Sequence, residues 1–333
     1  MPASAPLTNI KSRGRRKRQV AQARLTFHRK SQNPSTKTAS SSAPVRVVCI
    51  SDTHNKQPSL PLGDVLIHAG DLTESGSFDE MQTGLAWLSS QPHKHKIYVA
   101  GNHDVLLDEE FLTRYPERRY GQTKTKADLD WGDVVYLQDT SVILDIDTEG
   151  AAGDQNGTPS SSSSNRERKL TVFGSPWTPQ YGISAFQYRP DALDHWEEKM
   201  ALMEQPPDIL ITHGPPRHYL DQRDFHRAGC PYLADMVHRL RPRLMVFGHI
   251  HAAYGRDDLI LDAVQRAFGG VMTGWAGWGM LAWMAILVAW GRISYYLRNF
   301  TPLGEHKITT FVNAAVVVGQ QNELRNPPIV VEI

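Results

Sequence analysis

Short apolar runs recur along the chain from Val45 onward, and residues that favour turns bound most of them. Runs of this length, rich in Val, Ile and Leu, are typical of buried strands. Strands are therefore predicted at Val45–Ser51, Asp64–His68, Lys96–Ala100, Val134–Ile146, Lys169–Phe173, Asp208–Thr212, Arg243–Phe247, Ile308–Val318 and Pro328–Ile333.

Helical periodicity separates some of these runs. Ser77 and Glu80 form a capping box ahead of apolar residues spaced along one helix face. Asp191 is placed to cap a second helix over Ala192–Gln205, and Tyr232–Leu240 predicts a third. Strands that alternate with helices favour an α/β fold. The strands around residues 134–173 have no helix between them, which indicates a mixed sheet or a sandwich.

Three stretches interrupt this pattern. Residues 1–44 are rich in Ser, Arg, Lys, Pro and Gln, so they predict a disordered basic tail ahead of a domain over residues 45–333. Thr148–Arg168 is rich in Gly, Ser, Asn and Thr and predicts a low-complexity loop over residues 148–168. Ala267–Gly291 contains no charged residue and lies within a hydrophobic insert at about 257–305.

Charge is divided unevenly along the chain. Residues 1–51 contain eleven Lys or Arg and no Asp or Glu, whereas the remainder contains 25 basic and 35 acidic residues. Such an acidic body does not suit nucleic-acid binding, so no nucleic-acid-binding surface is expected on it. The basic run at residues 13–18 fits a nuclear localisation signal, a membrane-surface contact or a mitochondrial presequence. A solvated tail with no targeting role fits as well as these alternatives combined.

The two cysteines, Cys49 and Cys230, are far apart in the sequence and match neither a disulfide framework nor a cysteine zinc site. A reducing compartment is therefore expected, and with it an intracellular, cytoplasmic location. The oligomeric state is left open.

Polar residues gather just beyond five of the predicted strands. In α/β sheets, functional sites form at the carboxyl ends of strands, so these residues are expected to share one cleft. Glycines beside them allow the tight turns that convergence requires. The five groups are Asp52-Thr53-His54, Gly70-Asp71, Gly101-Asn102-His103-Asp104, His213-Gly214 and Gly248-His249-Ile250-His251.

Carboxylates and imidazoles in this arrangement suit a transition-metal site for Mn, Fe, Zn, Ni or Co. In extended backbone, residues two apart point to the same face, so Asp52 with His54 and His249 with His251 would form two clamps. Two clamps are more than one ion needs. Asp71 could then bridge two ions as a shared carboxylate.

The five blocks together, in this order, resemble the calcineurin-like metallophosphoesterases, in particular the small metallophosphoesterase-domain proteins of fungi and animals. The likeness covers residues 45 to about 256 and returns for the closing strands. It is strengthened by Leu66–Thr73, Gly174-Ser175-Pro176-Trp177 and Thr212–Pro216. It implies a four-layer α/β/β/α sandwich of two mixed β-sheets with metals at one edge.

The resemblance also implies which residues bind each ion and which take part in proton transfer. One divalent ion would take Asp52, His54, Asp71 and His251, and the other would take Asp71, Asn102, His213 and His249. A bridging hydroxide would attack phosphorus while His103 protonates the leaving oxygen, and Asp104 would orient His103. Manganese is the metal expected to support activity in vitro.

The expected substrate is a small phosphodiester or phosphomonoester. Protein Ser/Thr phosphatases continue after Gly-Asp with an Asp-Arg pair that contacts phosphate, but here Leu72-Thr73-Glu74 follows. A protein phosphatase and a non-catalytic scaffold on the same fold are the two alternatives. Trp177, Tyr181 and Phe186 are candidate walls of a substrate cleft, with packing under a loop as the competing interpretation.

Ala267–Gly291 has the length of a bilayer span and four of the eight Trp residues, but its Trp are spread along it and six residues are Gly. By the resemblance, Thr310–Val318 returns to the same sheet as Val45–Ser51, which argues against one span. Residues 267–291 are therefore predicted to contact one leaflet as a hairpin or interfacial helix. A helical insert packed on the protein itself is the equal alternative. The headgroup contacts would be Arg256, Arg266, Arg292 and Arg298.

Overall fold

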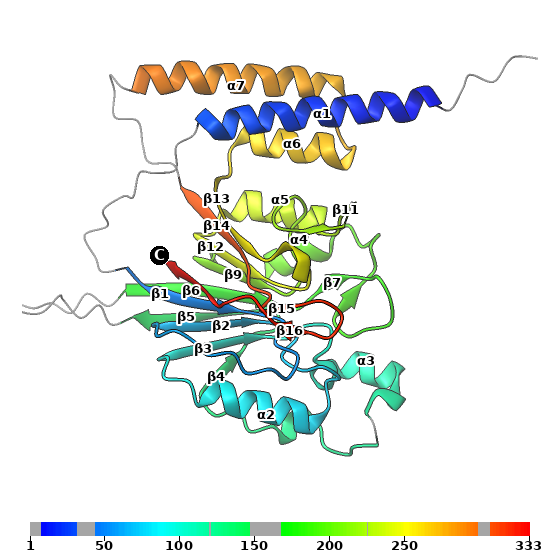
Figure 1. Ribbon diagram of the computed structural model, residues 1–333, viewed down its shortest axis with the longest axis vertical. Helices are drawn as coiled ribbons and strands as arrows, with labels where there is room; N and C mark the ends of the chain where they lie inside the picture. The colour runs from blue at the N-terminus through cyan, green and yellow to red at the C-terminus, as the bar shows by residue number, and fades with distance from the viewer. Residues whose placement is uncertain (1–7, 32–43, 120, 147–167, 225, 299–306) are drawn as a thin grey trace, which may run out of the picture. The chain divides into compact units, whose positions relative to one another are not determined.

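The computed structural model describes residues 8–31, 44–119, 121–146, 168–224, 226–298 and 307–333 (Figure 1). The chain divides into two compact units. The sandwich unit comprises Thr38–Asp258 and Thr309–Ile333, and the helical unit comprises Met1–Lys37 and Leu259–Ile308. The loop predicted at 148–168 falls outside the described residues except for Arg168, which begins a strand.

The first sheet of the sandwich unit has five strands and is mixed. Neighbouring strands β1 to β4 run parallel, and β17 closes the other edge antiparallel to β1. Its spatial order is β17 (Ile329–Glu332), β1 (Arg46–Ile50), β2 (Val65–Ala69), β3 (His95–Val99) and β4 (Val134–Tyr136).

The second sheet has six strands, with β5 antiparallel to β6 and parallel pairing from β6 through β9 and β12 to β14. The expected return of Thr310–Val318 to the sheet of Val45–Ser51 is wrong for Thr310–Asn313, which pairs with β12 in this sheet. Further along, Ala315 forms an isolated parallel bridge with Ser51. Five of the six residues of β14 are buried, which suits an interior strand between two neighbours. The order is β13 (Gly255–Ile260), β14 (Ile308–Asn313), β12 (Leu244–Phe247), β9 (Ile209–Thr212), β6 (Arg168–Ser175) and β5 (Thr140–Ile146).

The two sheets face each other across one hydrophobic core, and this confirms the predicted α/β/β/α sandwich. Val47 and Ile67 from the first sheet pack with Val172, Ile211 and Val246 from the second. The opposite face of the first sheet is covered by α2 (Phe78–Ser89). The second sheet is flanked by α4 (His195–Ala201) and α5 (Pro231–Leu240) (Figure 1).

Two predicted helices illustrate how local chemistry sets helix ends. The capping box of Ser77 and Glu80 is present at the start of α2, as predicted. The helix expected over Ala192–Gln205 covers only His195–Ala201. The carboxylate of Asp191 does not cap it and instead pairs with the guanidinium of Arg189 at 3.0 and 2.8 Å. The remaining elements are α3 (Glu109–Arg114), β7 (Thr178–Pro179), β8 (Gln187–Tyr188), β10 (Gln222–Arg223), β11 (His226–Arg227), β15 (Val317–Val318) and β16 (Glu323–Leu324).

The helical unit contains α1 (Thr8–Ser31), α6 (Ala263–Thr273) and α7 (Trp278–Arg298). The prediction of disorder for residues 1–44 is therefore wrong over α1. Two of its apolar residues, Ala21 and Leu25, share one helix face and are buried against α6 and α7, whereas Val20 and Phe27 are exposed. Because these partners lie more than 200 residues further along the chain, local composition alone could not reveal the packing.

A polar contact adds to this packing inside the helical unit. The His28 ring pairs with the Asp262 carboxylate at 2.6 Å, and His28 is only 4% exposed. Asp262 also caps α6 by accepting the backbone N–H of Gln265 at 3.0 Å. The same carboxylate therefore starts α6 and ties it to α1.

We expect Leu25→Ala to lower the stability of the helical unit by about 2–4 kcal/mol, because it removes buried methyl groups and leaves a cavity. Amide hydrogen exchange in α6 and α7 measures the effect. Gln22→Ala, on the exposed side of α1, is the matched control and should leave the exchange unchanged. Equal exchange in both variants would show that α1 does not stabilise this unit.

Candidate metal centre

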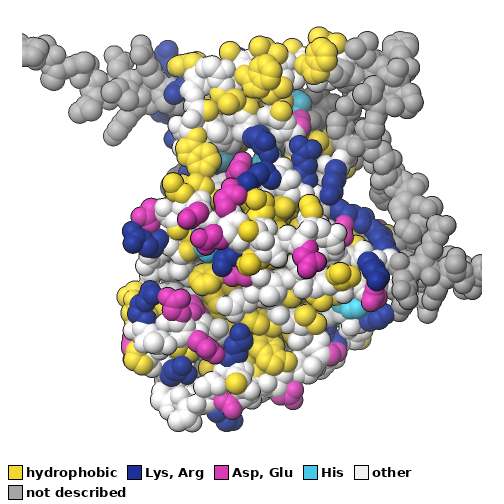
Figure 2. All heavy atoms as spheres, turned by 180° about the vertical axis from the view of Figure 1, so that it is seen from behind, with side chains coloured by type: hydrophobic (Ala, Val, Ile, Leu, Met, Phe, Trp, Pro, Cys, Tyr) yellow, Lys and Arg dark blue, Asp and Glu magenta, His cyan; other side chains and the backbone are white. Residues whose placement is uncertain are grey.

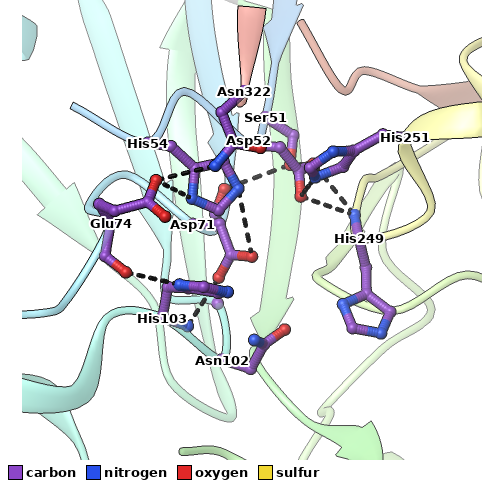
Figure 3. A network of polar contacts seen from close by, with 12 residues as sticks. Ser51, Asp52, His54, Asp71, Glu74, Asn102, His103, His249, His251 and Asn322 are labelled. Carbon is purple, nitrogen blue, oxygen red and sulfur yellow. Dashed lines mark hydrogen bonds and ion pairs between the residues drawn. The ribbon is translucent and has the colours of Figure 1, made fainter. Parts of the chain in front are cut away.

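The seven predicted metal ligands converge where strands of both sheets end, and Figure 3 labels all of them except His213. Asp52 and Asp71 follow β1 and β2, and Asn102 follows β3, all in the first sheet. His213 and His249 follow β9 and β12 in the second sheet. The cluster therefore depends on the packing that holds the two sheets together.

The backbone at the ligands is not extended, which corrects the geometry expected from the Asp-x-His and His-x-His spacing. The strands stop at Ile50 and Phe247, and Asp52, His54 and His249 then adopt φ values of 54°, 44° and 67°. These left-handed turns are costly for residues with a Cβ and are typical of functional sites. The backbone bond from Asp52 N–H to Gly70 O at 2.8 Å helps to hold the first turn.

The first ligand group consists of Asp52, His54 and His251. One ligand atom from each lies within 4.8 Å of the others, and His251 Nε2 is 3.2 Å from Asp52 Oδ1. Asp52 is completely buried and also accepts the backbone N–H of His249. The arrangement fits a cation bound by one carboxylate and two imidazoles.

The second ligand group consists of Asp71, His213 and His249, again with ligand atoms within 4.8 Å of one another. The amide oxygen of Asn102 points to the same place, 3.1 Å from His213 Nε2. His213 is fully buried, and Asn102 and Asp71 are 3% and 2% exposed. The two predicted four-residue sets are thus brought together as two adjacent groups.

The hydrogen bonds of the histidines fit metal ligands. His213 donates Nδ1–H to the carbonyl of Ala69 at 2.9 Å, so Nε2 faces the cluster and is the atom that would bind a cation once its proton is released. Both ring nitrogens of His54 are buried and have no hydrogen-bond partner within the described residues. Buried polar atoms are rarely left unsatisfied. A cation would satisfy one nitrogen of His54 directly.

Buried charges dominate the electrostatics. Burial opposes ionisation of Asp71, but the neighbouring His213 and His103 hold the pKa of Asp71 well below its usual range. Burial likewise opposes protonation of His213, yet the charge of Asp71 raises the pKa of His213 to about 9. Burial and the nearby His213 lower the pKa of His249 to about 3. Without a cation, these effects favour a protonated His213 beside a neutral His249.

His103 stands beside the ligands and has its ring fixed from one side. Its Nδ1–H donates to the carbonyl of Glu74 at 2.6 Å, and its backbone N–H donates to Asp71 Oδ1 at 2.8 Å. The prediction that Asp104 orients His103 is corrected by this geometry. The buried Asp104 carboxylate instead accepts the backbone N–H groups of Thr73 and Gly101 at 3.0 and 2.7 Å, so it fixes the loops that carry Asp71 and His103.

Two supporting residues were not assigned a role from the sequence. His68 is fully buried and contacts the hydroxyl of Thr53, between two ligands, at 2.9 Å. Ser51 donates its hydroxyl to Asp52 Oδ2 at 2.6 Å. Both lie within two residues of a motif in the sequence, but only the fold shows where their side chains point.

Glu74 also enters the site. Its carboxylate lies 3.4 Å from His54 Nδ1 and accepts a hydrogen bond from Asn322 at 2.8 Å (Figure 3). Asn322 is far away in the sequence, and a lone Glu after the Gly-Asp block carries no signal of this contact.

The three aromatic candidates separate clearly in the structure. Phe186 is fully buried in the core, so its assignment to a substrate wall is wrong. Trp177 packs on Phe186 and donates its indole N–H to Asp139 at 2.9 Å, which supports the packing interpretation. Tyr181 is 57% exposed, and its ring centroid is 5.2 Å from that of His249. Tyr181 therefore remains the aromatic candidate for substrate contact.

The fold and this ligand set define a metallophosphoesterase-type centre. Residues 45–253 match the family model for the calcineurin-like phosphoesterases. The chain belongs to this family, in agreement with the resemblance seen in its motifs.

Known relatives are similar over different parts of their length. Metallophosphoesterase domain-containing protein 1 of Homo sapiens is 39% identical over 63% of this chain and 61% of its own length. A protein named probable rhamnogalacturonate lyase C from Emericella nidulans is 40% identical over 87% of this chain but only 24% of its own length. The match thus spans less than two thirds of either relative. A crystal structure of a Thermus thermophilus protein aligns with a TM-score of 0.38 at 14% identity, over 66% of this chain and 86% of that one.

We expect the affinity of the metal-free chain for Mn²⁺ to rise from about pH 6 to about pH 9, because a metal must displace the proton held by His213. Titration calorimetry in buffers with different heats of protonation counts the released protons. His213→Asn should release fewer protons, whereas the exposed His226→Gln should match the unchanged chain. An affinity independent of pH would contradict the assignment.

Proposed function

We propose that the chain is a dinuclear metal-dependent hydrolase of small phosphoesters. One observation carries this proposal: the carboxylate of Asp71 lies between the two ligand groups. Its Oδ2 is 3.3 Å from His213 Nε2 and 3.9 Å from His54 Nε2. A single buried oxygen between imidazoles of both groups suits a bridging ligand.

The donor set indicates which metals would bind. Carboxylate, amide and imidazole ligands suit Mn, Fe, Zn, Ni or Co, and manganese is the one proposed for activity in vitro. Two such cations, when bound, would neutralise phosphate charge and lower the pKa of an attacking water. The ligand side chains would fix the positions of both cations at the edge where the two sheets end. Cations fixed in this way would align a bound phosphate with the attacking water.

His103 is the proposed general acid. Burial opposes its protonation, but the charge of Asp71 and the hydrogen bond to the Glu74 carbonyl raise the pKa of His103 above its usual value. The raised pKa favours the protonated imidazole that a general acid needs. Its Nδ1–H is engaged with Glu74, so Nε2–H is the proton available to a leaving oxygen.

The loop after Asp71 supports a small substrate over a phosphoprotein. Thr73 turns its hydroxyl to Asp104 at 2.8 Å, and Glu74 places a partly exposed carboxylate beside His54. No arginine follows Asp71 to bind a phosphate, and the Glu74 charge disfavours a dianionic monoester relative to a singly charged diester. A scaffold function is less well supported, since every ligand and His103 is retained.

The location proposed for the enzyme is intracellular. Cys49 and Cys230 are both buried free thiols, which suits a reducing environment. Burial raises the pKa of both thiols, so they are poor nucleophiles.

The Asp71→Asn variant should bind both ions more weakly or not at all, because the substitution removes the one negative charge that two cations would share. Elemental analysis of purified protein measures the metal content, and activity should fall with it. Asp145→Asn, an exposed carboxylate on β5, is the control and should keep two ions per chain. A single ion in fully active protein would contradict the dinuclear proposal.

His103→Ala should retain both metals while kcat falls by about 10²–10⁴, the usual contribution of a general acid. The loss should be smaller for nitrophenyl esters than for alkyl esters, since nitrophenolate leaves without a proton. Parallel kinetics on both ester types tests this. An equal loss on the two would argue against proton donation by His103.

With Mn²⁺, bis-aryl phosphates and cyclic nucleotides should be hydrolysed more efficiently than phosphoserine peptides. The reason is the negative charge of Glu74 and the missing arginine at the phosphate position. Comparison of kcat/KM across these substrates decides between the proposal and a protein phosphatase. Glu74→Gln should bring kcat/KM for monoesters closer to kcat/KM for diesters. A phosphopeptide as the preferred substrate would overturn the ranking.

A further inference from the structure

One face of α7 is apolar and exposed. Trp283 and Trp290 are 52% and 65% exposed, and Ile286 and Ile293 between and after them are 56% and 51% exposed. Their spacing of three, four and three residues places them on one side of a helix. The preceding turn and first residue add two more exposed indoles, those of Trp275 and Trp278.

The opposite face of α7 already has its partners. Leu281, Met284 and Val288 are buried with residues of α1 and α6. A helix that is apolar on both sides normally has both sides covered. The exposed side is a patch of the kind that marks an interaction surface. Figure 2 shows hydrophobic side chains gathered on this unit.

Charge indicates what covers this patch. The helical unit contains 14 Lys or Arg and only 2 Asp or Glu, whereas the rest of the chain is acidic. Arg15, Arg16 and Arg18 are exposed on α1. The Arg292 guanidinium of α7 lies 4.2 Å from the ring of Phe27 on α1, so the basic and apolar surfaces adjoin. A surface of opposite charge that accepts indole and aliphatic groups is an anionic lipid bilayer.

Topology requires a binding mode in the plane of the membrane. The chain leaves the second sheet after β13 and re-enters it through β14, the neighbouring strand. Both flanks of the insert therefore lie on the same side of any bilayer. Within the described residues, no helix has the length and apolar character needed to cross a membrane.

We propose that the helical unit binds the surface of an anionic membrane, with the Trp-rich face of α7 in the headgroup region and the arginines of α1 and Arg292 against lipid phosphates. Indole rings favour this interfacial region. The inference is independent of the phosphoesterase chemistry, because none of its residues belongs to the metal centre.

Flotation of the full chain with vesicles tests the proposal. Neutral phosphatidylcholine vesicles are compared with vesicles that also contain phosphatidylserine. We expect binding at least about tenfold tighter to the anionic vesicles, and weaker binding as salt rises. Equal affinity for both vesicles, or no binding to either, would overturn the proposal.

Two double variants locate the contact. We expect each double variant to reduce vesicle binding by roughly tenfold or more. The first, Trp283→Ser with Trp290→Ser, removes two indole rings from the headgroup region. The second, Arg15→Gln with Arg16→Gln, removes two positive charges that attract anionic lipids. Because these side chains are exposed, the fold should persist, and circular dichroism checks it. Leu193→Ser with Leu202→Ser, equally exposed at 62% and 58% on the sandwich unit, is the control and should bind normally.

A protein occupant gives a different result. If the patch joins two copies of the chain, sedimentation without lipid shows a dimer for the unchanged chain and a monomer for the Trp283/Trp290 double variant. In that case neither the unchanged chain nor the variant binds vesicles. That outcome would overturn the membrane proposal. A monomer that binds anionic vesicles through the same residues supports it.

Discussion

The candidate site depends on one buried carboxylate. Asp71 is 2% exposed, and an ionised carboxylate in such a place is strongly unfavourable unless charges and hydrogen bonds compensate for it. The compensation comes from His213 of the second sheet and from the backbone of His103 in the first. Because the partners come from both sheets, the site can form only when the core between the sheets is packed.

The same constraint explains the geometry of the surrounding loops. Left-handed residues such as Asp52 and His249 are tolerated because hydrogen bonds from neighbouring turns hold them. Asp104 fixes two of these turns at once by accepting their backbone N–H groups. Left-handed residues and the buried carboxylates of Asp52, Asp71 and Asp104 thus lie together at this edge of the sandwich.

The helical unit is held together by a small hydrophobic core. Its basic helix α1 and its apolar hairpin of α6 and α7 come from segments far apart in the sequence, yet they share one small core. An acidic sandwich unit with a cationic, Trp-bearing unit combines two surfaces of opposite character in one chain. The proposed membrane contact and the proposed phosphoester chemistry therefore depend on separate sets of residues, which can be changed independently.

The motifs by themselves indicated the family and, through it, the α/β sandwich and seven candidate ligand positions, because each candidate follows within a few residues a strand whose apolar run is visible locally. Tertiary structure decided what depends on distant contacts. The Asp-x-His segment forms left-handed turns and not an extended clamp. The Glu74 carbonyl, and not Asp104, orients the ring of His103, and Phe186 lies in the core. Tertiary structure also folded residues 8–31 into α1, because the stability of that helix comes from burial against partners that no local window of the sequence contains.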